Sequence, residues 1–419
     1  MTPKRVITVA PMPPEKSAYA LARYSRSADS IRQSVEWVKT HNSQQFLESF
    51  YFQYGHQSIA DLGHTVLCFE GISELAASEI EDEVLWDGQA KSSRYQDFGK
   101  GGFITPPEFD AAARAKYQAA GNALLDAYRE LHQTMTDHLT EKLPRPEAMK
   151  PEAYKRNIAA RAFDVARYLL FWGVPTNVGQ VTSIRTLEKQ IRRLRVSEFA
   201  EVRELGEEIA QACAAPPECT WDHTQTEPLA PTLARHAEPD EYLRQAHFDL
   251  QRWAEQNLRV GAYTTQRDVD LVKPDDVLSE IVATLLYPVC AHPFGDIYRT
   301  VRDWSKALQT EVLSVAVGAR GKRDDLLREF RGGQYCFDML IDVGAYRDLH
   351  RHRRCHQYRQ AYSGAHGVEV PQAVQEAGAE DRFVGAMNAA LIAMRDLPEP
   401  GRQYLLPFGA KSRFLFKMD

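Results

Sequence analysis

The chain has 419 residues, which is too long for one typical domain and predicts two or three. With 44% hydrophobic and 26% charged residues, its composition is that of an ordinary globular protein. The formal net charge of −6 argues against a general nucleic-acid binder, because neutralising phosphates requires a surplus of Lys and Arg.

The N-terminal residues, "MTPKRVITVAPMPPEKS", contain no apolar core long enough for a signal peptide. No later segment approaches the length of a membrane span. Six cysteines are scattered without a C-x-x-C pair, which fits reduced thiols better than a disulfide framework. We therefore expect a cytoplasmic protein without a membrane partner.

The first half of the chain predicts a series of helices with one strand–helix unit. Residues 18–25, "AYALARYS", form an apolar helical stretch that ends in tyrosine. Residues 65–86, "TVLCFEGISELAASEIEDEVLW", predict a short apolar strand, then Gly71, then a helix. That helix would have one apolar face, formed by Ile72, Leu75, Ala76, Ile80 and Val84. Two further blocks follow, "FITPPEF" (103–109) and "ARYLLFWG" (166–173), before a long basic helical segment.

The second half repeats these pieces in the same order. The four counterparts are "IVATLLYP" (281–288), "QYCFDMLIDVGAYRDLHRHR" (334–353), "VEVPQAV" (368–374) and "GRQYLLPFG" (401–409). We interpret the chain as two diverged tandem modules, residues 1–220 and 263–419, joined by a linker at 221–262 that is rich in Pro, His and acidic residues. The second module stops where the first continues, so either it is naturally short or the chain is a shortened version of a longer one.

A basic cluster in the second module, residues 347–363, holds five arginines and three histidines in seventeen positions. Arginine forks bind phosphates bidentately, so the cluster is a candidate phosphate site. A solvated helix end and ion pairing with Asp342 and Asp348 are the alternatives. We expect no metal site, because the arginines interleaved among His350, His352 and the neighbouring cysteine would repel a dication.

The blocks "YGHQSIAD", "TVLCFEGIS", "QAKSSRYQDF", "FITPPEF", "ARYLL", "SIRTLEKQIRRL" and "SEFAEVRELG" together resemble the flavin-dependent thymidylate synthases, the ThyX family. The signature of that family is an Arg-His-Arg triplet, a serine three positions later, and a Ser-x-Arg-Tyr element. The resemblance implies an α+β fold, here two tandem ThyX-like modules, each with helices packed on an antiparallel sheet. Single-module relatives form tetramers with active sites between chains, so we expect a homodimer of pseudo-tetrameric shape.

Each module has lost a different half of the signature. In the first, the triplet would fall at Asp82, Glu83 and Val84, and the segment "EIEDEV" is acidic. In the second, the triplet is kept, but His356 replaces the following serine. The later Ser and Arg positions of the second module hold Ala361 and Ser363.

The resemblance implies FAD as cofactor, with NADPH and methylenetetrahydrofolate as co-substrates and dUMP as substrate. The expected cofactor-binding residues are Arg351, His352, Arg353, His56, Ser58 and Arg185. The expected substrate-binding residues are Ser92, Arg94, Tyr95 and Arg167, of which Ser92 and Arg94 are the catalytic candidates. Asp61 matches a family acid beside the cofactor pocket, and a later phosphate arginine of the family falls at Leu194, between two arginines.

Two other functions remain open from the sequence. One is a flavoenzyme of the same fold that acts on a different pyrimidine nucleotide or carbon donor. The other is a non-catalytic relative with degenerate signatures. A nucleic-acid partner is not expected, because the basic cluster lacks the aromatic platform on which bases stack, beyond Tyr358 and Tyr362.

Overall fold

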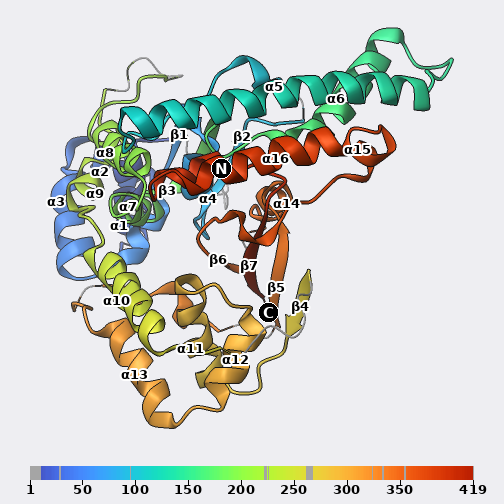
Figure 1. Ribbon diagram of the computed structural model, residues 1–419. Coiled ribbons are helices and arrows are strands. Elements are labelled where there is room, and N and C mark those ends of the chain that lie inside the picture. Colours follow the sequence, from blue (N-terminus) through green and yellow to red (C-terminus); the bar gives the residue numbers. More distant parts are fainter. Residues whose placement is uncertain are drawn as a thin grey trace. The chain divides into compact units, whose positions relative to one another are not determined.

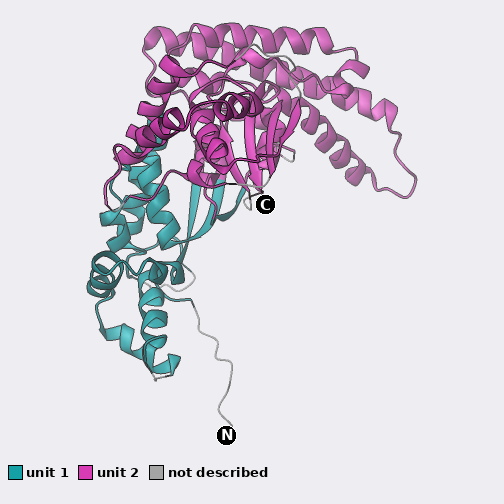
Figure 2. Ribbon diagram, turned by 90° about the horizontal axis from the view of Figure 1, so that it is seen from below, with its two compact units in different colours: residues 1–69, 85–89, 178–240 teal, residues 70–84, 90–177, 241–419 magenta. Residues whose placement is uncertain are grey.

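The computed structural model describes residues 11–27, 30–94, 96–220, 224, 226–260, 268–322, 324–332, 335–352 and 355–418. The chain divides into two compact units, which Figure 2 shows in different colours. Unit 1 comprises residues 1–69, 85–89 and 178–240, and unit 2 comprises 70–84, 90–177 and 241–419. None of the helices within the described ranges is both long and apolar enough to span a membrane.

Unit 1 is built mainly from helices. They are α1 (Pro14–Tyr24), α2 (Ile31–Thr40), α3 (Ser43–Leu47), η1 (Glu48–Gln53), η2 (Gln57–Leu62), α7 (Ile184–Leu194), α8 (Ala200–Ala214) and α9 (Pro231–His236). The apolar face of α7 recurs at helical spacing and is buried; its residues are Ile184, Leu187, Ile191 and Leu194. The expected helix at 18–25 is confirmed as the C-terminal part of α1, which ends at Tyr24.

A three-stranded sheet has the order β1-β3-β2. Its strands are β1 (His64–Ser73), β2 (Asp87–Ala90) and β3 (Pro175–Ser183), and each strand has residues in both units. After β1 the chain enters α4 (Glu74–Glu81). The strand–helix prediction is confirmed, but two details were wrong: Ile72 lies in the strand, and Val84 lies beyond the helix and is 44% exposed.

The second sheet lies wholly in unit 2, has the order β4-β5-β7-β6 and is antiparallel throughout. Its strands are β4 (Val269–Val272), β5 (Tyr335–Asp342), β6 (His356–Arg359) and β7 (Lys411–Met418). The helices α10 (Glu241–Asn257), α11 (Val277–Leu286), α12 (Phe294–Arg302) and α13 (Lys306–Val317) share one hydrophobic core with residues of β5, β6 and β7. The expected fold class, helices packed on an antiparallel sheet, is therefore confirmed.

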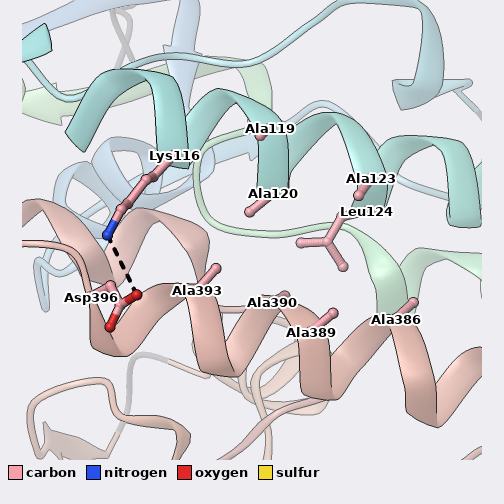
Figure 3. A pocket seen from close by; sticks show the side chains of 10 residues that line it. All are labelled: Lys116, Ala119, Ala120, Ala123, Leu124, Ala386, Ala389, Ala390, Ala393 and Asp396. Atoms are coloured by element: carbon pink, nitrogen blue, oxygen red, sulfur yellow. Dashed lines mark hydrogen bonds and ion pairs between the residues drawn. The ribbon is translucent and has the colours of Figure 1, made fainter. Parts of the chain in front are cut away.

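The other helices of unit 2 include the longest in the chain's described part. They are η3 (Phe98–Lys100), α5 (Ala111–Lys142), α6 (Pro151–Ala166), η4 (Arg167–Leu169), η5 (Tyr287–Val289), η6 (Arg328–Phe330), α14 (Val343–Leu349), η7 (Gly364–His366), α15 (Gln372–Glu376), α16 (Glu380–Arg395) and η8 (Gly401–Leu405). Helices α5 and α16 run side by side (Figure 1). Alanines from both helices line a groove between them, and Lys116 Nζ lies 3.5 Å from Asp396 Oδ2 at one end of it (Figure 3).

The two strand–helix junctions are built alike. Ser73 caps α4 by accepting a hydrogen bond from the third following N–H, and Asp342 caps α14 in the same way. Measured from these caps, Asp82 and Arg351 both lie nine residues downstream. Gly71 and Gly344, by contrast, are not equivalent: Gly71 is in β1 with φ of 68°, whereas Gly344 is inside α14. Counted from these glycines, Asp82 lies eleven residues and Arg351 seven residues downstream, so the four-residue difference comes from comparing unlike glycines.

The loops 168–173 and 404–409 pair with each other through matching backbone hydrogen bonds. Trp172 N donates to Leu406 O (3.3 Å), and its counterpart Phe408 N donates to Leu170 O (2.7 Å). Gly173 N and Gly409 N likewise donate, at 2.8 Å each, to the carbonyls of Tyr404 and Tyr168. Together with the shared strand order β1-β3-β2 and β5-β7-β6, these bonds support the tandem hypothesis. The boundaries 1–220 and 263–419 stay a prediction, and the expected linker contains the whole of α9 and α10.

Candidate functional site

Two arginines and two aspartates of unit 2 form a compact ionic cluster. Asp164 lies in the last turn of α6, and Arg167 follows at the helix end. Arg94 lies in the loop after β2, where its backbone N–H donates to Ser92 Oγ (3.3 Å) and fixes a turn. Asp348 comes from α14 of the second module. The structure thus brings the predicted substrate residues Ser92, Arg94 and Arg167 together with an acid from the other half of the chain.

The cluster joins each arginine to both acids. Asp164 Oδ1 lies 2.9 Å from Arg94 Nε and 3.1 Å from Arg167 Nε. Asp348 Oδ2 lies 2.9 Å from Arg94 Nη2 and 3.2 Å from Arg167 Nη2. The two guanidinium groups therefore meet at one carboxylate oxygen on each side, and the four charges cancel.

The remaining part of the signature lies directly after α14. Arg351 and His352 are exposed. Within the described residues, neither side chain makes a hydrogen bond or ion pair, although Arg351 lines a small pocket that also includes Glu81. Tyr95 and Arg353, the other predicted signature residues, lie outside the described residues. Arg351 and His352 are thus available to an incoming anion or planar ring.

His350, the first histidine of the basic cluster, is held inside unit 2. Its Nδ1 lies 3.0 Å from Tyr346 Oη and 2.9 Å from Gln357 Oε1, and its Nε2 lies 3.3 Å from Ser78 O. Both ring nitrogens are therefore engaged by protein atoms. In the ranges that the structure describes, no group of three or more His, Cys, Asp or Glu is arranged to hold a metal ion.

The acidic residues of α4 and its end pair with basic residues of the second module. Glu74 lies 2.7 Å from Arg347 Nη2 and Asp82 lies 2.8 Å from Arg328 Nη1. Glu79 forms a third ion pair with Arg359. These three pairs include two of the five arginines in the basic cluster and two acids, Glu79 and Asp82, of the segment that replaces the first triplet.

The expected ion-pair partners within the basic cluster were only partly right. Asp342 caps α14, where its Oδ1 accepts from Ala345 N at 2.7 Å. Asp348 does form ion pairs, but with the arginines of the first module described above. Sequence reasoning therefore missed Asp164, and it named Asp348 only as a partner within the basic cluster. Asp164 precedes Arg167 by three residues, a helical spacing that suggests such a pair.

The predicted cofactor residues of unit 1 lie around η2. Arg185 donates to Asp61 Oδ2 (2.9 Å) and to Gln57 Oε1 (3.0 Å). His56 and Ser58 are exposed beside it in sequence. The structure thus brings Arg185 to the acid that the family resemblance marked, and leaves His56 and Ser58 accessible.

A ladder of aromatic rings in unit 1 leads toward His56. Tyr19 stacks on Phe46 with ring centroids 4.1 Å apart, and Phe46 stacks on Phe50 at 4.7 Å. Phe50 in turn lies 6.5 Å from the ring of His56, at an interplanar angle of 26°. The spacing of Phe46, Phe50 and Tyr54 at every fourth residue was a signal for this ladder.

The later phosphate arginine expected at or beside Leu194 is not found in that role. Leu194 is fully buried in the core of unit 1. Its neighbour Arg195 donates to Ala237 O (2.5 Å) and to Glu207 Oε2 (2.7 Å), so it ties α7 to other parts of the same unit. A shift of one residue toward Arg195 therefore does not restore this position as a free phosphate ligand.

Comparison with known proteins places these features in context. Residues 6–216 match the family model of the thymidylate synthase complementing protein. A UPF0159 protein of Chlamydia muridarum is 28% identical over 389 residues, covering 87% of this chain and 70% of that protein. A UPF0159 protein of Thermoplasma acidophilum is 22% identical over 442 residues, covering 94% and 84%.

Two solved structures also align. The flavin-dependent thymidylate synthase ThyX of Helicobacter pylori, complexed with FAD and dUMP, has a TM-score of 0.32 and 16% identity, covering 48% of this chain and 89% of its own. The UMP/dUMP methylase PolB of Streptomyces cacaoi, bound with 5-Br dUMP, has a TM-score of 0.34 and 12% identity, covering 53% and 88%.

Proposed function

The chain belongs to the thymidylate synthase complementing protein family, and from this premise we propose that it is a flavin-dependent enzyme that methylates a pyrimidine nucleotide. The proposed reaction is the reductive methylation of dUMP to dTMP, with methylenetetrahydrofolate as carbon donor and NADPH as reductant. The observation that carries the proposal is the convergence of Arg94 and Arg167 on α14, the helix that leads directly into Arg351 and His352.

On the substrate side, Arg94 and Arg167 would hold the phosphate of the nucleotide. Their guanidinium groups already meet within hydrogen-bond distance of a common oxygen, as two-armed phosphate recognition requires. Ser92 fixes the turn that presents Arg94, and its hydroxyl hydrogen remains free to donate to the pyrimidine base. Tyr95 is proposed to orient or stack beside them.

On the cofactor side, Arg351 and His352 are exposed and make no side-chain hydrogen bond or ion pair with the residues that the structure describes, so they fit a ligand with phosphates and a planar ring. When bound, FAD would supply the electrons that reduce the transferred carbon. Arg351, with Arg353, would neutralise its pyrophosphate, and His352 would contact the ring. In unit 1, Arg185, His56 and Ser58 are the further candidates, and the aromatic ladder that ends at His56 suits a flat ligand.

We further propose one active site per chain. The position equivalent to Arg167 in the second module is Gln403, and the position equivalent to Arg94 is Ser363. The position equivalent to Asp348 is Glu79, which pairs with Arg359. The second possible site would therefore lack both phosphate arginines.

One observation favours a second candidate function. The acidic segment "EIEDEV" stands where the family has its first Arg-His-Arg triplet, and it pairs with Arg359 and Arg328, so this wall differs from that of the family. A flavoenzyme of the same fold that acts on another pyrimidine nucleotide or carbon donor is the alternative. Product analysis with dUMP and other uridine nucleotides would separate the two. A homodimer in the cytoplasm stays our prediction, to be checked by sedimentation.

The visible absorption spectrum of the purified protein, before and after FAD addition and gel filtration, tests the proposal. We expect a retained flavin band and dTMP formation from dUMP. Replacing Arg351→Met should weaken FAD binding by about tenfold to a hundredfold, the typical effect of losing a charge-assisted hydrogen bond. Arg244→Met is the matched control, because Arg244 pairs only with exposed Glu241 on α10. A colourless protein that binds no added FAD would instead indicate a non-catalytic relative.

A further inference from the structure

Asp348 is the member of the ionic cluster that an incoming phosphate would have to replace. Its Oδ2 accepts hydrogen bonds from Nη2 of Arg94 and Nη2 of Arg167, at 2.9 and 3.2 Å. One oxygen between two guanidinium ends is the arrangement in which arginines bind a phosphate oxygen. The carboxylate therefore stands where an oxygen of the ligand would stand.

The other acid of the cluster has a different relation to the same arginines. Asp164 Oδ1 faces the Nε atoms of Arg94 and Arg167. Asp164 lies in the last turn of α6, and Arg167 is the residue that follows this helix. It is therefore placed to orient Arg94 by a hydrogen bond from Nε and to pair with the charge of Arg167, while the Nη2 ends of both arginines point at Asp348. Asp164 holds the arginines, whereas Asp348 occupies their ligand-facing ends.

The exposure of the cluster allows Asp348 to leave. Its side chain is 42% exposed and Arg94 is 46% exposed, whereas the side chain of Arg167 is only 9% exposed. Asp348 also belongs to α14, while the other three residues belong to the first module. The carboxylate can leave half-exposed Arg94 at small cost, because an exposed ion pair contributes only about 0.2–1 kcal/mol. At the buried Arg167 guanidinium, the incoming phosphate takes the place of the carboxylate.

We propose that Asp348 is an internal competitor that occupies Arg94 and Arg167 until the phosphate group of a ligand displaces it. This inference rests on the proposed function, since it concerns the same nucleotide site. A phosphate monoester with two negative charges replaces one carboxylate, and it then lies close to the displaced carboxylate. Asp348 therefore lowers the affinity of the site for every phosphate-bearing ligand, and it does so without contacting the base.

Isothermal titration of the full-length protein with dUMP, and separately with inorganic phosphate, tests this role. Asp348→Asn should tighten binding of both ligands by about tenfold, because the ligand then no longer has to displace a carboxylate from half-exposed Arg94 and buried Arg167. Asp164→Asn should weaken binding of both, because the arginines lose the group that orients them. Asp126→Asn, which removes an exposed acid paired with Arg129 on α5, should leave both affinities unchanged.

The outcomes separate this proposal from the proposed function. If wild-type protein binds dUMP and Asp348→Asn leaves the affinity unchanged or weaker, the role of Asp348 is wrong and the nucleotide site stands. If Asp348→Asn gains affinity for inorganic phosphate but neither protein binds dUMP, the role of Asp348 stands and the nucleotide assignment fails. If Asp348→Asn binds neither ligand, the role is also wrong. Asp348→Ser removes the same carboxylate and should change both affinities as Asp348→Asn does. Melting curves for all variants show whether any substitution causes a folding defect.

Discussion

The ion pair between Glu74 and Arg347 offers the sharpest test of how much the buried charges of helix α4 contribute to the stability of the protein. The side chains of Glu74 and Arg347 are only 3% and 12% exposed, and their charged atoms lie 2.7 Å apart. The Arg347 guanidinium also lies 4.4 Å from the centroid of the Phe408 ring. Arg347→Met keeps the length of the side chain but removes its charge, so it leaves Glu74 without its partner.

The expected cost follows from burial. Removing one partner of a buried ion pair typically destabilises a protein by about 3–5 kcal/mol, because the remaining charge is not compensated. Burial already raises the pKa of Glu74, while Arg347 acts to lower it. Without Arg347, Glu74 therefore binds a proton more readily and escapes part of the penalty at low pH. The cost of Arg347→Met should be larger at pH 8 than at pH 5.

Urea denaturation followed by tryptophan fluorescence measures this cost. Arg244→Met is the matched control and should change the free energy of unfolding by less than about 0.5 kcal/mol, because its partner Glu241 is exposed. The double variant Arg347→Met/Glu74→Gln should recover part of the loss, since it leaves no buried charge. The reasoning is refuted if Arg347→Met unfolds within about 1 kcal/mol of wild type at both pH values.

Two further predictions concern stability. Burial raises the pKa of Glu188 from 4.5, so the stability that its bound proton contributes is complete below pH 4.5 and is lost as the pH rises through the folded-state pKa. Glu188→Gln should flatten this fall, as urea titrations at pH 4.5, 6 and 7.5 would reveal; an unchanged slope would contradict it. Gly173→Ala should destabilise the protein by about 1–3 kcal/mol, since the new Cβ would meet Tyr117 Oη at 2.0 Å. Gly409→Ala should cost less because its Cβ meets the flexible end of Met387, and equal urea midpoints for the two variants would contradict this.

The strand–helix units could be predicted from the sequence because their signals are local. The apolar runs before Ser73 and Asp342 and the helical spacing after them are read within about ten residues. The capping function of Ser73 and Asp342 is also typical of such residues at helix starts. The position of the second module's helix was less certain, because Gly344 resembles a break but lies within α14.

The partners of the charged side chains could not be predicted, because they are far apart in the chain. Arg94 and Asp348 are separated by 254 residues, and Glu74 and Arg347 by 273. The sequence shows an acidic helix and a basic cluster, but pairing depends on how the second module folds back on the first. For the same reason, a phosphate-site arginine and an arginine held in a structural ion pair look alike in the sequence.

The opposite charges at equivalent positions have a physical consequence of their own. Asp82 and Arg351 lie at the same distance from their helix caps, yet one is acidic and paired with Arg328 while the other is basic and unbonded among the described residues. In an assembly of identical modules, both positions would carry the same residue. One of them could then not form a structural ion pair while the other remained accessible to a ligand. Joining the modules in one chain removes this constraint. We therefore propose that the acidic segment at 79–83 is the structural half of a divided pair and that Arg351 and His352 are its ligand-binding half.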